Sequence, residues 1–144
     1  MKLQKIILIG LLTLLLLIST VIGHFLPPTG ILTSPIVISI IAGLIMFSDN
    51  SFNVIVKSIL TYLFIGLNDI GIKLFSGGIH DTEGMGWIHM LLFIGLVPSF
   101  IMLLVSVVRD KNSTNWIKAF SILLFILLIN IHLQLFDTLG VQEN

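Results

Sequence analysis

Residues 55–75 read IVKSILTYLFIGLNDIGIKLF, a long apolar run whose polar side chains all fall on one half of a helix. At about 100° per residue, that half carries Lys57, Ser58, Thr61, Tyr62, Asn68, Asp69 and Lys73. The opposite half has no polar group. An apolar face suits lipid, whereas a polar face needs protein or water, so this pattern indicates a membrane-spanning helix whose polar face points inward. This face is the first candidate site.

The composition of the whole chain fits the same environment. Of 144 residues, 56% are hydrophobic and 10% charged, with zero formal net charge and a mean hydropathy of +1.15. A soluble domain carries about 25% charged residues, and disorder or nucleic-acid binding also needs more charge. The chain has no cysteine, which excludes disulfides, thiolate metal ligands and cysteine nucleophiles. We therefore predict an all-α integral membrane protein without a nucleic-acid partner.

Five segments are candidate spans, because a bilayer core requires about 20 mostly apolar residues per helix. They lie in a single domain over 1–144, at about 5–24, 30–48, 55–75, 86–108 and 116–136. The second is the weakest, since Ser34 followed by Pro35 is typical of a helix N-terminus. A helix that begins at Pro35 would be only about 20 Å long. A re-entrant segment, with four spanning helices, is the alternative.

Basic residues near the loops distinguish the two topologies. If 30–48 spans, six of them share one side and Lys73 stands alone on the other; the six are Lys2, Lys5, Lys57, Arg109, Lys111 and Lys118. If 30–48 is re-entrant, the division is three against four. Because basic loop residues accumulate on the cytoplasmic side, we predict five transmembrane helices and a cytoplasmic N-terminus in a bacterial-type inner membrane. The N-terminal run resembles a secretory signal but is long and lacks an A-x-A site, so we expect an anchor helix.

Asp69 is the residue of the polar face that most needs a partner. A charged aspartate near a helix centre costs about 2.5–3.5 kcal/mol even on lenient insertion scales. Lys73 follows one turn later and can pair with it. We expect an Asp69–Lys73 ion pair whose ammonium extends to the outer interface. The alternative is that Asp69 binds a proton or an ion.

A second ionisable group falls toward the predicted outer side and consists of His80, Asp81, Glu83, His89 and His132. Imidazoles and carboxylates from different helices can bind a divalent metal or form a proton relay. None of their spacings matches a known ligand motif. His132 also lies on a different face of its helix from Asn130, Gln134 and Asp137. We therefore expect no cofactor, with a divalent metal as the alternative.

The fourth predicted helix carries a stripe of small side chains, Gly95, Ser99 and Ser106, that permits close contact with another helix. No serine in the spans has an adjacent base of recognised geometry, so nucleophilic catalysis finds no support. The leading hypothesis is a non-enzymatic membrane subunit. Its partners would be the lipid bilayer and other membrane protein subunits, or further copies of itself.

Two other functions remain open. One is a proton- or metal-translocating component whose path is lined by Lys57, Thr61, Asn68 and Asp69, with His89 and His132 at its mouth. The other is an intramembrane metal-dependent enzyme that uses the outer histidines and acids as ligands or bases.

Overall fold

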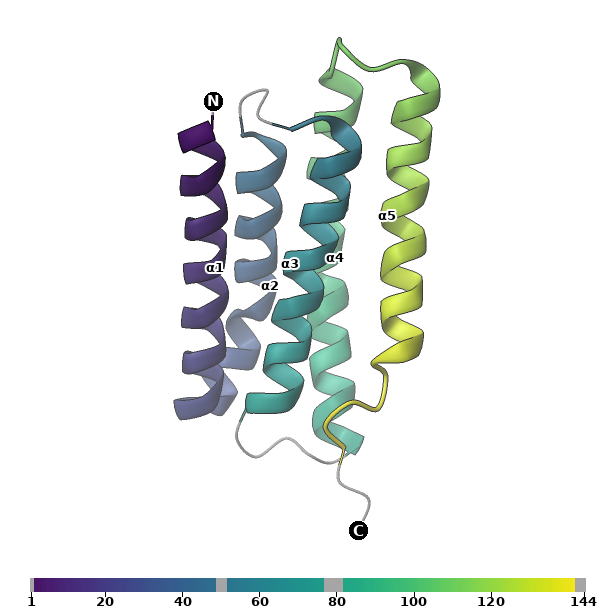
Figure 1. Ribbon diagram of the computed structural model, residues 1–144. Coiled ribbons are helices and arrows are strands. Elements are labelled where there is room, and N and C mark those ends of the chain that lie inside the picture. Colours follow the sequence, from purple (N-terminus) through teal and green to yellow (C-terminus); the bar gives the residue numbers. More distant parts are fainter. Residues whose placement is uncertain (1, 49–51, 77–81, 142–144) are drawn as a thin grey trace.

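The computed structural model describes residues 2–48, 52–76 and 82–141, and within these ranges it contains five α-helices and no β-strand. The helices are α1 (Lys2–Phe25), α2 (Pro27–Met46), α3 (Val54–Phe75), α4 (Thr82–Arg109) and α5 (Asn115–Leu135). They run alternately up and down in one bundle (Figure 1). All five are long and apolar enough to cross a membrane, as the sequence predicts.

The helices differ in how many neighbours they have. α3 lies in the middle and contacts each of the other four (Figure 1). Among the described segments, α1 contacts only α2 and α3, and α5 contacts only α3 and α4. α3 can therefore bury polar side chains against several partners, whereas α1 and α5 keep wide outward faces.

The start of α2 differs from the sequence prediction. The helix begins at Pro27 rather than at Ser34–Pro35, and Pro35 lies inside it. Pro27 occupies the first turn, where proline is tolerated because the backbone N–H there has no intrahelical partner. The Ser34 hydroxyl does not cap a helix but accepts a hydrogen bond from Asn68 Nδ2 (3.1 Å). α2 is thus one continuous helix of 20 residues, which favours a spanning helix over a re-entrant segment.

The corner between α1 and α2 depends on two glycines. A Cβ at Gly30 would overlap the backbone of Gly23, so a side chain there would push the helices apart. Leu26 N–H donates to the Ile22 carbonyl (2.8 Å), and Gly30 N–H donates to the Leu26 carbonyl (2.9 Å). Helical hydrogen bonding therefore continues through the corner, and α2 turns back directly beside α1.

The basic side chains are divided unequally between the two ends of the bundle. One end, where α1, α3 and α5 begin (Figure 1), is called the basic end and carries Lys5, Lys57, Arg109, Lys111 and Lys118. The opposite end carries Lys73 and is called the Lys73 end. Trp87 and Trp116 are exposed near opposite ends, in the positions that aromatic anchors occupy at membrane interfaces.

Candidate functional site

The polar face of α3 points into the bundle. The structure buries Ser58, Thr61, Asn68, Asp69 and Lys73, and it partly buries Lys57 and Tyr62. The outward face is narrower than the apolar half of the helix. Phe64 belongs to that half but packs against Leu12 of α1, which leaves a strip containing Leu63 and Leu67 exposed. α3 therefore has only a narrow exposed surface.

Three ionisable side chains meet inside the bundle near the Lys73 end, and we call Asp69, Lys73 and His132 the Asp69 cluster. Lys73 Nζ lies 2.8 Å from Asp69 Oδ2, as the i,i+4 spacing predicts. His132 Nε2, from α5, lies 3.0 Å from the same oxygen and must donate, because a carboxylate only accepts. All three residues are buried. One carboxylate oxygen thus joins α3 to α5.

Lys73 also caps the C-terminus of α5. Its Nζ donates to the carbonyl of Phe136 (2.8 Å), the C-cap residue of α5, where unpaired helix carbonyls favour a cation. The buried ammonium thus has a second partner at the Lys73 end of the bundle, beside Asp69. That it extends to the outer interface stays a prediction. Gly140 has a φ of 89°, and a Cβ there would overlap the Lys73 carbonyl. The segment after α5 folds against the end of α3.

The remaining outer residues form a separate contact. His89 Nε2 lies 3.5 Å from Asp137 Oδ1, and Glu83 is exposed in the first turn of α4. His80 and Asp81 lie outside the described residues. Over the described ranges, no group of three or more His, Asp and Glu side chains is placed to hold a metal ion. His132 and His89 each pair with a different aspartate there.

Further along α3, polar side chains join helices in pairs. Asn68 Nδ2 reaches Ser34 of α2, as described above. The hydroxyls of Ser58 and Ser121 lie 2.6 Å apart, and Ser121 in turn donates to the carbonyl of Val54 (2.9 Å). This second contact ties α5 to α3 near the basic end. α5 is therefore attached to α3 by polar contacts at two levels.

Six buried side-chain polar atoms have no hydrogen-bond partner in the described part of the chain, and three of them belong to the polar face of α3 or to the Asp69 cluster. These three are Thr61 Oγ1, Asn68 Oδ1 and His132 Nδ1. Buried polar atoms of native proteins are nearly always paired, with protein or with ordered water. A water molecule bound beside any of these three atoms would supply the missing hydrogen bond.

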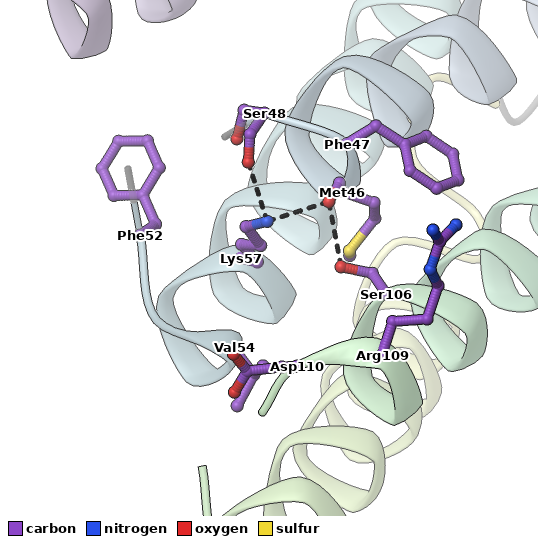
Figure 2. Close-up of a pocket in the computed structure, with 9 residues that line it drawn as sticks. All are labelled: Met46, Phe47, Ser48, Phe52, Val54, Lys57, Ser106, Arg109 and Asp110. Atoms are coloured by element: carbon purple, nitrogen blue, oxygen red, sulfur yellow. Dashed lines mark hydrogen bonds between the residues drawn. The ribbon is translucent and has the colours of Figure 1, made fainter. Parts of the chain in front are cut away.

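A pocket of about 360 Å³ opens at the basic end (Figure 2). It is lined by Met46, Phe47, Ser48, Phe52, Val54, Lys57, Ser106, Arg109 and Asp110. Lys57 Nζ donates to the carbonyls of Met46 (2.8 Å) and Ser48 (3.0 Å), and the Ser106 hydroxyl donates to the Met46 carbonyl (2.9 Å). These side chains cap the C-terminus of α2. Beyond the spans, a hydrogen bond from Ser113 lowers the pKa of Asp110.

The small-residue stripe of α4 packs within the chain. A Cβ at Gly95 would lie 3.0 Å from Pro35 Cα, and Ser99 is buried with its hydroxyl 3.5 Å from the Ile38 carbonyl. Ser106 contacts the end of α2, as described above. The stripe thus lets α4 approach α2 closely. Gly95 and Ser99 are buried, and Ser106 is partly exposed in the pocket at the basic end.

Sequence reasoning missed the pairing of His132 with Asp69 and of Ser34 with Asn68. Asp69, His89 and His132 fall at similar predicted depth, but depth does not say how each helix is rotated. It also missed that Asn130 and Gln134 are exposed on α5, where Gln134 Nε2 donates to Asn130 Oδ1 (2.8 Å). In the sequence, Asn130 and Gln134 share one face of the helix, and His132 lies on another. This pattern could have indicated that the two amides and His132 do not face the same surroundings.

Comparison of the chain with protein-family models, curated proteins and solved structures gives no match. Its function must therefore be inferred from its own residues.

Proposed function

We propose that this chain is a non-enzymatic integral membrane protein that works by lateral contact with other membrane-spanning helices. It lies in a bacterial-type inner membrane with its N-terminus and the basic end in the cytoplasm. Five apolar helices support the membrane location, and the position of the basic side chains supports the orientation. With little chain outside the helices, its contacts are made chiefly through helix faces.

The observation that carries this proposal is the exposed pair of Asn130 and Gln134. Asn130 lies five residues from the end of α5, about 8 Å along the helix, and so within the hydrocarbon core. An amide with unpaired hydrogens costs several kcal/mol there, because lipid tails accept no hydrogen bond. The internal polar groups, by contrast, largely serve the bundle's own helix contacts. The exposed amides therefore support a protein partner at this surface.

The proposal is tested by photo-crosslinking in native membranes. A benzophenone amino acid replaces Ile126, which lies one turn from Asn130 on the exposed side of α5, or Leu14, which is exposed on the apolar face of α1. We expect protein adducts from position 126 and mainly lipid adducts from position 14. Lipid adducts alone from position 126 would contradict the proposal.

Proton translocation through the α3 interior is the second candidate. The unpaired atoms of Thr61, Asn68 and His132 favour it, because water molecules bound there would continue the polar path from Asp69. The test measures proton flux in proteoliposomes containing the original chain or Asp69→Asn. Flux that is abolished by this substitution supports the path, and flux that is equal in both removes it.

A further inference from the structure

The outward face of α5 carries a continuous heptad pattern. Phe120, Leu127 and Gln134 recur at intervals of seven, and Leu123 and Asn130 each follow one of them by three positions. This is the a/d spacing that lets two helices pack side by side over several turns. We call these five residues the α5 seam.

The α5 seam is exposed in the part of the chain that the structure describes. Phe120, Leu123 and Leu127 are 55%, 64% and 55% exposed, and both seam amides are exposed as well. α5 packs on the bundle through Ser121, Phe125 and His132, its buried residues. Two distinct faces therefore share this helix, one for the chain's own bundle and one directed outward.

The outward face of α1 is a useful comparison, because it has the composition expected of a helix that contacts only lipid. Gln4 and His24 are exposed near its two ends, but between them the exposed side chains are apolar except Thr13. The hydroxyl of Thr13 donates to the carbonyl of Ile9 within the helix (2.9 Å). α5 differs because it exposes the Asn130 amide five residues before the end of the helix, whereas the exposed amide of α1, Gln4, lies in the first turn. The apolar side chains of α1 need no hydrogen-bond partner in lipid. The amide hydrogens of α5 need acceptors, which lipid tails do not provide.

We propose that the α5 seam binds the α5 seam of a second copy of this chain, as a parallel pair about a two-fold axis along the membrane normal. All copies enter the membrane in one orientation, so Asn130 meets Asn130 of the second copy at the same depth. An amide both donates and accepts, so it is complementary to itself. This inference rests on the proposed function and names the partner that the proposed function leaves open.

The hydrogen-bond inventory fits such a pair. Gln134 Nε2 already donates to Asn130 Oδ1. Among the described residues, this leaves the Asn130 Nδ2 hydrogens and the Gln134 Oε1 lone pairs for contacts with another molecule. Across the axis, Asn130 Nδ2 faces carbonyl oxygens of the same two residue types. Polar residues in an otherwise apolar heptad seam also fix its register. The seam thus specifies one alignment of the two copies.

Single cysteines test the seam directly, because the chain has no cysteine of its own. Leu123→Cys and Leu127→Cys lie on the seam, and Leu135→Cys lies off it, although Leu135 is 71% exposed. Under mild oxidation in native membranes we expect disulfide-linked dimers from the first two and few from the third. Equal yields of disulfide-linked dimer at all three positions would contradict the proposal that the α5 seam is the interface.

A second measurement tests the amide in the purified protein. Energy transfer between labelled copies in bilayers gives the association constant, which we expect to fall about tenfold in Asn130→Leu, or about 1.4 kcal/mol, and to recover substantially in Asn130→Gln. Because Asn130 is exposed, its substitution should leave the thermal unfolding of the single chain unchanged. An association constant equal to that of the original chain in Asn130→Leu would refute the role of the amide.

The two proposals fail in different ways. If crosslinking at position 126 captures a different membrane protein and the seam cysteines give no dimer, the proposed function is supported. The proposal that the partner is a second copy is then wrong. If position 126 captures lipid only and the copies do not associate, both proposals are wrong. Both proposals are supported if the seam cysteines give dimers and Asn130→Leu lowers the association constant.

Discussion

The Asp69 cluster gives the most demanding test of how this bundle is held together. Asp69 and Lys73 are buried and in contact. Removing one charge of a buried pair typically costs about 3–5 kcal/mol, because the other charge stays buried and uncompensated. Removing both charges leaves no such charge behind. We therefore expect Asp69→Asn and Lys73→Met each to lower the free energy of unfolding by about 3 kcal/mol.

The double variant should lose less than the sum of the single losses. His132 Nε2 can still donate to the oxygen of an asparagine at position 69, so the main remaining loss is the hydrogen bond from Lys73 to Phe136. Leaving that carbonyl unpaired costs about 1–3 kcal/mol. We expect a total loss of about 2 kcal/mol in the double variant, against about 6 for independent effects.

The measurement is reversible unfolding in a mild detergent or in bicelles, followed by circular dichroism. Leu67→Ala is the matched control, because Leu67 lies on the same helix and is 42% exposed on its outward face. We expect this control to cost less than about 1 kcal/mol. If the losses of the two charge variants simply add, the ion pair makes no coupled contribution and the reasoning is wrong.

Three further predictions follow from local contacts. Gly30→Val should destabilise the chain by more than about 2 kcal/mol in the same unfolding assay, since its Cβ meets the Gly23 backbone; an unchanged stability would mean that α1 and α2 do not touch there. Ser34→Ala should lower the free energy of unfolding by about 1–3 kcal/mol, because it leaves Asn68 Nδ2 buried without its acceptor; an unchanged stability would count against this contact. Ser113→Cys and Glu83→Cys should be labelled by a membrane-impermeant maleimide from opposite sides, whereas labelling from one side would disprove the predicted topology.

Hydropathy and helical periodicity predict the number and type of the helices. Five apolar runs of sufficient length leave few other arrangements in a bilayer, and the observed helix ends lie within a few residues of the predicted ones. The failure at Ser34–Pro35 has a physical cause. A local rule for helix starts applies when the preceding residues are not helical, but here α2 starts earlier, at Pro27. Pro35 then lies inside the helix, where it closely approaches Gly95 of α4.

The candidate site is only partly predictable, because a sequence gives the depth of a residue and not the rotation of its helix about its axis. The contact of Lys73 with Asp69 is local and follows from spacing. The contact of His132 with Asp69 depends on which face α5 turns toward α3. The same limit applies to Ser99, whose stripe indicates a close helix contact but not that α2 provides it.

The two polar ties of α5 also explain why its outward face can act as a fixed surface. Ser121 attaches the helix near the basic end, and His132 attaches it near the Lys73 end. Both ties lie on the inner side, so they set the rotation of α5 and direct Asn130 outward. A helix without such ties could turn its amides toward the bundle. The internal charges of this chain thus orient the helix that we expect to bind a second copy.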